Sequence, residues 1–434
     1  MKDIQVGIIG FGTVGKGLAY ALLEQQERLR QKTGITFTLK TVADIAITEL
    51  PAEFAGVTLT ARAADIFADP QIDIVVELIG GMEPAKSFLL AAIDAGKHVI
   101  TANKALLSVH GGEIFRAAAA KNVEVGFEAS VGGGIPVIKA LKEGLVANRI
   151  NFIEGIMNGT ANYILSQMTD RGTPFVEVLA EAQQLGYAEA DPTYDVEGID
   201  TAHKLAILMT LAYGKNVRLE HITVEGISSI EPIDIRFAEK FGFRIKLLAI
   251  SRNHGDSFEA RVHPTMVPKS HMLATVNGAF NGIQFQGDTV GDVMLYGRGA
   301  GMMPTGSAVC ADVVDIGRNI SCGSVNRVPA LAFLPEHIGE PTITPMRHLV
   351  CPYYFRVTAL DQPGVLAMIT GIFGKYGISI QSMMQDGQDS GEPVYIVFRT
   401  HNAEEDAVVK AIAEIDGLPV CSAPTVKIRI LNPE

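Results

Sequence analysis

The stretch Ile4-Gln5-Val6-Gly7-Ile8-Ile9-Gly10-Phe11-Gly12-Thr13-Val14-Gly15 decides the fold of the first part of this 434-residue chain. Its apolar half predicts a buried strand over Ile4–Ile9, and Gly15–Leu29 has the apolar spacing of a helix. The glycines between them have the spacing G-x-G-x-x-G, which permits a tight turn, a close approach of a pyrophosphate and close helix–strand packing. The motif therefore predicts a dinucleotide site at Gly10, Phe11, Gly12, Thr13, Val14 and Gly15, with a purely structural turn as the alternative.

Strands and helices alternate after this motif. Further strands are predicted at Thr38–Ala43, Ile72–Leu78, His98–Thr101 and Val123–Phe127, and helices at Glu83–Ala95 and Gly111–Ala120. Apolar strands separated by helices are typical of an α/β fold with a doubly wound parallel sheet of the Rossmann type. We place this dinucleotide-binding domain at residues 1–135, because a glycine-rich junction follows it.

The rest of the chain is predicted to form two more domains. An α+β domain for catalysis and dimerisation is expected over residues 136–318, and a proline-rich linker over 319–348. Residues 349–434 have the order β-α-β-β-α-β, which is ferredoxin-like. The predicted elements are Tyr353–Ala359, Gly364–Tyr376, Ser379–Gln385, Pro393–Thr400, Glu404–Ile415 and Thr425–Ile430.

Composition excludes several classes of partner. The chain has 36 Lys and Arg against 48 Asp and Glu, a net charge of −12, which opposes binding to nucleic acids and anionic membranes. The uncharged run Leu205–Tyr213 falls far short of the roughly 20 residues that span a bilayer. The cysteines form no Cys-x-x-Cys pair, so we expect a reducing compartment and a cytoplasmic protein. They are Cys310, Cys322, Cys351 and Cys421.

Asp44, at the end of the second predicted strand, bears on the choice of cofactor. A carboxylate at this point accepts hydrogen bonds from the ribose and repels a 2′-phosphate. No arginine stands beside Asp44, which favours NAD(H), although Lys40 or Arg62 could turn toward a phosphate. A solvated aspartate is the alternative.

Charged residues gather at two further points. Asp200 and Lys204 are four residues apart on a predicted helix and therefore share a face. The loop before them carries Glu189, Asp191 and Asp195, while Lys104 follows a strand at the presumed ligand edge of the sheet. Carboxylates beside a lysine suit an amino-acid substrate and an acid catalyst, and an ordinary ion pair is the alternative. His203 is expected to be structural.

Together these segments resemble the homoserine dehydrogenase family. The resemblance rests on the spaced motif from Ala182 through Gly186-Tyr187-Ala188-Glu189-Ala190-Asp191-Pro192 to Asp195, Asp200 and Lys204. It extends to Thr101-Ala102-Asn103-Lys104, Gly155-Ile156-Met157-Asn158-Gly159-Thr160, Asn162-Tyr163 and Gly299-Ala300-Gly301. The segment Asp361-Gln362-Pro363-Gly364-Val365-Leu366, with Gly377-Ile378, resembles an amino-acid-sensing ACT domain.

The resemblance implies the reversible, NAD(P)-dependent reduction of L-aspartate 4-semialdehyde to L-homoserine, in threonine and methionine biosynthesis. It implies that Lys204 donates the proton beside Lys104, and that Glu189 and Asp200, with the nearby Asp195, bind the substrate. It also implies cofactor contacts at Gly186 and Gly301. A sodium or potassium site is implied at Glu128, Val131, Gly133 and Ile135, where mostly backbone carbonyls and one carboxylate supply hard oxygen ligands.

Two other readings remain open at this point. The chain could be a different Rossmann dehydrogenase of an amino-acid-like substrate, or a cofactor-binding regulator without catalysis. We also expect a homodimer or homotetramer, no fused aspartokinase segment, and inhibition by L-threonine that disappears when the chain is cut near Pro345.

Overall fold

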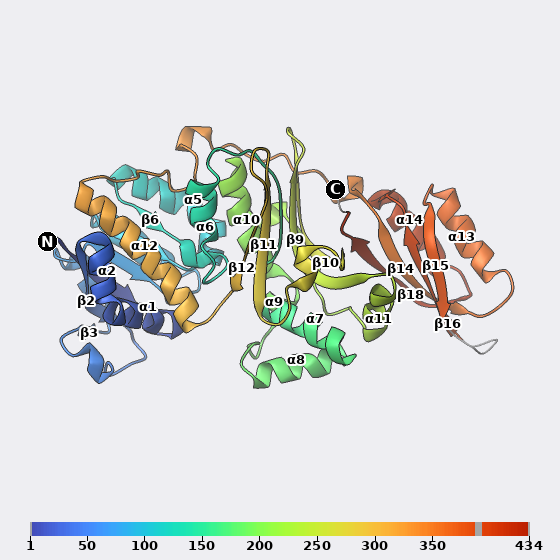
Figure 1. The fold of residues 1–434 in the computed structure, drawn as a ribbon, viewed down its shortest axis with the longest axis horizontal. Helices are drawn as coiled ribbons and strands as arrows, with labels where there is room; N and C mark the ends of the chain where they lie inside the picture. Colours follow the sequence, from blue (N-terminus) through green and yellow to red (C-terminus); the bar gives the residue numbers. More distant parts are fainter. Residues whose placement is uncertain (1, 387–392, 433–434) are drawn as a thin grey trace. The chain divides into compact units, whose positions relative to one another are not determined.

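The computed structural model describes residues 2–386 and 393–432, and the chain divides into two compact units (Figure 1). Unit 1 consists of Met1–Gly159, Asp200–Ile222 and Ala279–Pro341. Unit 2 consists of Thr160–Ile199, Thr223–Gly278 and Thr342–Glu434. Each unit is therefore built from segments that are far apart in the sequence. No helix within the described ranges is both long and apolar enough to cross a membrane.

Unit 1 contains a six-stranded parallel sheet, which confirms the predicted doubly wound fold. Its order is β3 (Thr58–Thr60), β2 (Ile35–Ala43), β1 (Lys2–Ile9), β4 (Ile74–Glu77), β5 (His98–Thr101) and β6 (Val125–Gly126). The chain builds outward from β1 to β3 and then resumes on the other side with β4. The switch point is therefore between β1 and β4, at whose carboxyl ends such sheets bind ligands. Strand β3 was not predicted, because its three residues are too few and too polar to show an apolar strand pattern.

The helices that connect these strands differ from prediction at two places. The expected helix over Gly15–Leu29 is divided at Gln25 into α1 (Thr13–Glu24) and α2 (Gln26–Thr33). α5 (Lys104–Lys121) begins earlier than expected, because the Asn103 side chain caps it by accepting from the Leu106 N–H at 3.1 Å. Lys104 is thus the first residue of a helix. The other helices here are α3 (Ala63–Ala68) and α4 (Ala85–Asp94).

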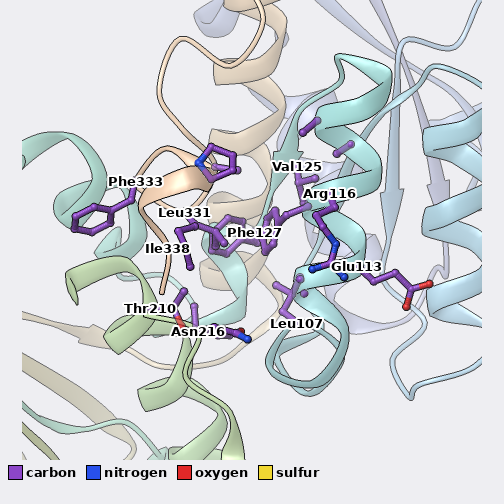
Figure 2. A pocket seen from close by; sticks show the side chains of 18 of the residues that line it. Leu107, Glu113, Arg116, Val125, Phe127, Thr210, Asn216, Leu331, Phe333 and Ile338 are labelled. Carbon is purple, nitrogen blue, oxygen red and sulfur yellow. The ribbon is translucent and has the colours of Figure 1, made fainter. Parts of the chain in front are cut away.

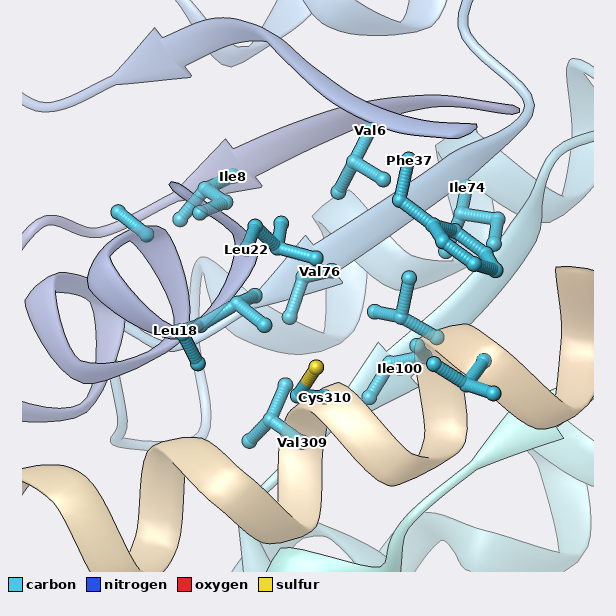
Figure 3. Packing of buried hydrophobic residues seen from close by; sticks show 14 of the residues in the cluster. Val6, Ile8, Leu18, Leu22, Phe37, Ile74, Val76, Ile100, Val309 and Cys310 are labelled. Atoms are coloured by element: carbon cyan, nitrogen blue, oxygen red, sulfur yellow. The ribbon is translucent and has the colours of Figure 1, made fainter. Parts of the chain in front are cut away.

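A helix from late in the sequence completes the core of this sheet. α12 (Met302–Cys322) packs along α1, and its Val309 and Cys310 share one apolar cluster with Leu18, Val6 and Val76 (Figure 3). The contact is close: a Cβ on Gly17 would lie 2.1 Å from the Met302 carbonyl oxygen. Most of α12 falls in the span 136–318 that we expected to be a separate domain. Its apolar stripe could be buried against any partner, and the sequence does not say which.

The rest of unit 1 is a smaller antiparallel layer with helices. β11 (Phe280–Gly287) pairs with β12 (Gly291–Arg298) on one side and with β7 (Ile150–Ile156) on the other. The short helix α6 (Val137–Lys139) continues into a π-helical turn at Ala140–Gly144. α10 (Ile199–Tyr213) carries Asp200 and Lys204 in its first two turns.

Unit 2 joins an α+β part to the C-terminal domain. The α+β part contains α7 (Gly159–Arg171), α8 (Phe175–Gln184), α9 (Thr193–Val196), β8 (Thr223–Val224), α11 (Pro232–Lys240), β9 (Phe243–Asn253) and β10 (Phe258–Pro268). The C-terminal domain contains β14 (Tyr353–Leu360), α13 (Val365–Lys375), β15 (Ile380–Asp386), β16 (Pro393–Thr400), α14 (Glu405–Asp416) and β18 (Cys421–Ile430). Its strand order, β18-β14-β16-β15, confirms the ferredoxin-like domain. β13 (Val350–Cys351) and β17 (Ala403–Glu404) form a separate small pair.

The C-terminal domain is firmly attached within unit 2. β18 pairs in parallel with β10, and the buried Arg429 of β18 binds Glu225 through two hydrogen bonds of 2.8 and 2.9 Å. Arg356 of β14 binds the fully buried Asp234 of α11 at 2.7 and 3.1 Å. Cutting the chain near Pro345 would therefore expose the β10 edge and leave Asp234 buried without its arginine.

Candidate active site

The glycine motif forms a turn with room for a ligand at one position. Gly10 has φ +96, and a Cβ there would lie 2.8 Å from the Leu78 carbonyl oxygen. A Cβ on Gly15 would lie 2.1 Å from the Gly10 carbonyl oxygen, whereas one on Gly12 would meet no atom within 4 Å. Phe11 is buried edge-on against Phe54, with ring centroids 5.8 Å apart. The loop is therefore packed on its inner side and open at Gly12, where Thr13 and Val14 begin α1.

Asp44 is held against this loop. Its Oδ2 accepts from the Phe11 N–H at 2.6 Å, and its Oδ1 accepts from the Ala46 N–H at 2.7 Å. The two cations that could have turned toward a ribose phosphate have other partners. Lys40 Nζ lies 2.6 Å from Asp69, and Arg62 Nε lies 3.6 Å from Asp65.

Glu77, at the end of β4, is a buried residue that the sequence analysis did not single out. Its Oε1 accepts from the Ile79 and Gly80 N–H groups, and its Oε2 accepts from the Thr101 hydroxyl at 2.6 Å. Burial raises the pKa of this carboxyl, although the hydrogen bonds act in the opposite direction. Glu77 thus ties the loop after β4 to the end of β5. Only its position at a strand end could have signalled this role.

Lys104, Lys204 and Asn158 all contact the carboxylate of Asp200. Lys204 Nζ lies 2.7 Å from Asp200 Oδ2, as the spacing of four residues predicts. Lys104 Nζ lies 3.0 Å from Asp200 Oδ1, which joins the start of α5 to the start of α10. The buried Asn158 donates to Asp200 Oδ2 at 2.8 Å, and Lys204 donates to the Met157 carbonyl at 2.6 Å. The roles of Asn158 and Met157 were missed because nothing in the sequence places them beside α10.

The neighbouring charges determine the ionisation state of the Asp200 carboxyl. Burial by itself would raise the pKa of the Asp200 carboxyl, but the ammonium groups of Lys204 and Lys104 and two hydrogen bonds hold it well below its usual range. Asp200 is therefore ionised at neutral pH. Lys204 donates two of its three N–H bonds, and the third has no acceptor among the residues that the structure describes. That N–H is available to an incoming oxygen.

His203 lies next to Lys204 in the sequence but contacts a different residue. Its Nδ1 is 2.5 Å from the hydroxyl of Ser108, which lies one turn after Lys104 on α5. Burial lowers the pKa of this imidazole, with Asp200 acting in the opposite direction. The contact joins α10 to α5, and the structural role expected for His203 stays a prediction.

The acidic loop belongs to unit 2. Glu189 is exposed, Asp195 is half-buried in α9, and Gly186 is exposed in a left-handed conformation with φ +75. The loop is anchored at Tyr187, whose carbonyl accepts from the Thr160 hydroxyl at 2.7 Å. Its ring packs on that of Tyr163, with centroids 4.7 Å apart.

The segment 128–135 and Gly301 lie in unit 1. Both carboxylate oxygens of Glu128 accept backbone N–H groups, from Ile138 and Lys139, each at 2.9 Å. The carboxylate therefore closes onto the start of α6, and a cation here would rely on backbone carbonyls. Val131, Gly133 and Ile135 are buried, and a Cβ on Gly133 would lie 2.3 Å from the Gly299 carbonyl oxygen. Gly301, with φ +124, precedes α12.

Comparison with known proteins covers nearly the whole chain. Residues 136–314 match the family "Homoserine dehydrogenase", residues 10–128 match "Homoserine dehydrogenase, NAD binding domain", and residues 353–419 match "ACT domain". A homoserine dehydrogenase from Pseudomonas aeruginosa is 47% identical over 434 residues, which are 99% of each chain. One from Neisseria gonorrhoeae is 43% identical over 430 residues, also 99% of each chain.

Solved structures agree with these sequence matches. The crystal structure of a homoserine dehydrogenase from Thiobacillus denitrificans is 47% identical and superposes with a TM-score of 0.94, covering 100% of this chain and 99% of that one. A shorter chain from Archaeoglobus fulgidus is 35% identical, with a TM-score of 0.66, and covers 72% of this chain and 99% of its own length.

Proposed function

The chain belongs to the homoserine dehydrogenase family, and we propose how its residues divide the work of interconverting L-aspartate 4-semialdehyde and L-homoserine. A nicotinamide cofactor, when bound, supplies or accepts the hydride at the substrate carbon that carries the oxygen. As the aldehyde is reduced, its oxygen gains negative charge and needs a nearby cation and a proton. The residues around Asp200 offer both.

Lys204 is the proposed proton donor. The observation that carries this assignment is its third N–H, which is left without an acceptor in the described structure while the other two are held by Asp200 and Met157. Two fixed hydrogen bonds orient the ammonium group, so that the remaining proton has a defined direction. Asp200 positions Lys204 and Lys104 together, and Lys104 adds positive charge to the same site.

The test is an assay of cofactor oxidation with aspartate semialdehyde. Replacing Lys204 with Ala should lower kcat by about 10²–10⁴-fold, as expected for the loss of a general acid, while the Kd for the cofactor changes little. Lys121→Ala is the matched control, since Lys121 is an exposed lysine at the end of α5 that pairs with Asp94. Near-normal turnover in Lys204→Ala would remove Lys204 from the mechanism.

The acidic loop is proposed to bind the substrate's amino group. Glu189 is exposed and carries a charge suited to an ammonium, and Asp195 follows it in α9. Asp200 already holds two lysines, so we assign it to positioning rather than to direct contact with that amino group. Glu189→Gln should raise the KM for homoserine without changing the KM for the cofactor. An unchanged KM for homoserine would instead indicate a solvated loop.

For the cofactor, we propose that NAD(H) is used at least as well as NADP(H). Asp44 stands beside the glycine loop with a negative charge, and both nearby cations are engaged with Asp69 and Asp65. A 2′-phosphate would meet that carboxylate. We assign further cofactor contacts to Gly186 and Gly301. Comparing kcat/KM for the two cofactors tests this choice, and a strong preference for NADPH would contradict it.

A sodium or potassium ion is proposed to bind the backbone carbonyls of Glu128, Val131, Gly133 and Ile135. The left-handed turn at Gly132 and Gly133, with φ +74 and +55, redirects successive peptide groups in this buried segment. Such an ion would brace the segment against Gly299 without taking part in proton transfer. Activity and melting temperature should rise with added K⁺ or Na⁺ relative to a bulky quaternary ammonium salt.

The C-terminal ACT domain is proposed to bind L-threonine where Asp361–Leu366 turns into α13. Gly364 has φ +92 and caps that helix. The resemblance to ACT domains implies that two such domains pair side by side. We accordingly propose a homodimer or homotetramer, which sedimentation would measure.

We also keep the proposed functional division into residues 1–135, 136–318, 319–348 and 349–434. The four free cysteines support a reducing, cytoplasmic setting.

A further inference from the structure

A large cavity in unit 1 lies apart from the residues assigned to catalysis (Figure 2). Its volume is about 830 Å³, which is within the range of ligand pockets. One wall is α5 from Leu107 onward, and another is the second half of α10 with the loop that follows it. The segment 326–340 and the segment 123–127 around β6 complete the lining. In Figure 2 the lining side chain of Phe127 lies near the middle of the view, with Leu331 to its left and Ile338 and Thr210 below.

Among the described residues, side-chain contacts join the first two turns of α5 to the first two turns of α10. Lys104 meets Asp200 at 3.0 Å and Ser108 meets His203 at 2.5 Å. Beyond these contacts the segment 326–340 bridges the helices, and two backbone hydrogen bonds fasten it to the end of α10. Asn216 N–H donates to the Gly339 carbonyl at 2.8 Å, and Gly339 N–H donates to the Gly214 carbonyl at 3.0 Å.

The walls of the cavity are largely apolar, and most of its charged residues have partners. Glu113 lies 2.8 Å from Lys86. Glu340 accepts from Asn216 at 3.0 Å, and Arg218 pairs with Glu220 at 3.0 Å. Arg116 differs from them: it is exposed, it lines the cavity, and no carboxylate of the described residues forms an ion pair with it. The hydrogen bond from Lys86 lowers the pKa of the Glu113 carboxyl, and the charge of Arg116 also acts on Glu113 and adds to this effect. The cavity therefore offers apolar walls and one guanidinium group that forms no close ion pair within the described residues.

We propose that this cavity binds a small molecule with an apolar body and a single carboxylate. The body displaces water from Phe127, Leu331 and their neighbours, which is favourable for apolar surface. The carboxylate pairs with Arg116, whose planar guanidinium suits it. A zwitterionic amino acid is a poorer fit, because the acidic groups of the lining that could hold its ammonium, Glu113 and Glu340, already have partners.

Calorimetric titration of the full-length protein with octanoate tests this proposal, with 1-octanol as the uncharged comparison. Octanoate should bind at one site per chain and at least fivefold more tightly than octanol. Arg116→Gln should weaken octanoate binding at least fivefold, whereas Arg28→Gln, an equal change on the exposed face of α2, should not. Octanol binding should be the same in all of these proteins.

A neighbouring pair of alanines tests the position of the site. Ala119 lines the cavity and Ala120 does not, although both are exposed on α5. Ala119→Leu should reduce octanoate affinity severalfold, and Ala120→Leu should leave it unchanged. Absence of saturable binding to the wild type, or equal losses in both members of either pair, would overturn the proposal. The proposal would also fail if the wild type bound no octanoate while Arg116→Gln and Ala119→Leu changed the oligomeric mass. That result would show that a second copy of the chain covers the cavity.

Discussion

Asp200 is a buried carboxylate between two ammonium groups, and this arrangement has consequences for stability. Breaking a buried ion pair by removing one partner costs about 3–5 kcal/mol, because the remaining charge is left in a poorly solvated place. In Asp200→Asn, Lys204 would keep the Met157 carbonyl but lose its counter-charge. Lys104 is better placed, because 36% of its side chain is exposed.

We therefore expect Asp200→Asn to lower the free energy of unfolding by about 3 kcal/mol at pH 7, the lower end of that range. Urea denaturation measures this change. Asp256→Asn, in an exposed turn, is the matched control and should be neutral within about 0.5 kcal/mol. A loss no larger than that of the control would show that the Asp200 cluster is solvated in solution.

The same pair of proteins gives a pH dependence with a definite sign. The pKa of Asp200 is lower in the folded chain than its ordinary value of 3.8, so folding favours the ionised form. Its contribution is complete above that ordinary value and is lost as the pH falls toward the folded-state pKa. The stability difference between wild type and Asp200→Asn should be constant from pH 7 to about 5 and shrink below about 4. A difference that grows with acidity would contradict this linkage.

At the scale of the elements, the turn between β1 and α1 contains glycines that are needed for two different reasons. At Gly15 a side chain would collide with the Gly10 carbonyl oxygen, so the fold itself requires glycine. At Gly12 the backbone has φ −74, which any residue can adopt, and the space around a Cβ is open. Packing therefore does not require a glycine at position 12, and the missing side chain leaves room there for a ligand.

This difference predicts opposite outcomes for two small changes. Gly12→Ala should leave the melting temperature within about 2 °C of the wild type but weaken cofactor binding about tenfold or more, because the pyrophosphate approaches the backbone there. Gly15→Ala should lower the melting temperature as well as the affinity. Thermal unfolding and NADH fluorescence titration measure the two quantities. Equal cofactor affinity in Gly12→Ala and wild type would place the phosphates elsewhere.

At the scale of the whole molecule, the ACT domain shares its sheet with strands of the α+β part of unit 2. β18 pairs with β10, and Arg356 and Arg429 attach the domain to α11 and to Glu225. An effector that favoured one conformation of the domain would therefore act on this shared layer. Because truncation near Pro345 would damage that layer, full-length variants are the sharper test of threonine inhibition.

We expect L-threonine to inhibit the full-length protein and Gly364→Ala to raise the half-inhibiting concentration severalfold. A side chain at φ +92 is strained and would shift the turn where the effector is proposed to bind. Gly371→Ala, on the same helix α13 with open space around its Cβ and no such φ, is the control. Rates without threonine should be equal in all three proteins. If the wild type does not respond, the domain serves pairing alone; if Gly364→Ala responds normally, the effector binds elsewhere.

Local patterns determined the elements of this protein. Apolar runs and glycine spacing fix strands and turns because they act over a few residues, so β1, the glycine loop and the β-α-β-β-α-β order could be predicted. The Asp200–Lys204 pair followed in the same way from one turn of helix. The family resemblance then implied roles for residues, such as Glu128, whose own pattern suggested only a turn.

Tertiary structure alone decided the contacts between distant segments. α12 returns to the first sheet, Asn158 and Lys104 converge on Asp200 from 42 and 96 residues away, and Glu77 joins two strand ends. The linker closes a cavity over α5 and α10. A helix buries its apolar stripe against whichever surface fits best, and a carboxylate pairs with whichever cation packing brings near. These choices depend on the shape of the assembled chain, which no short pattern contains.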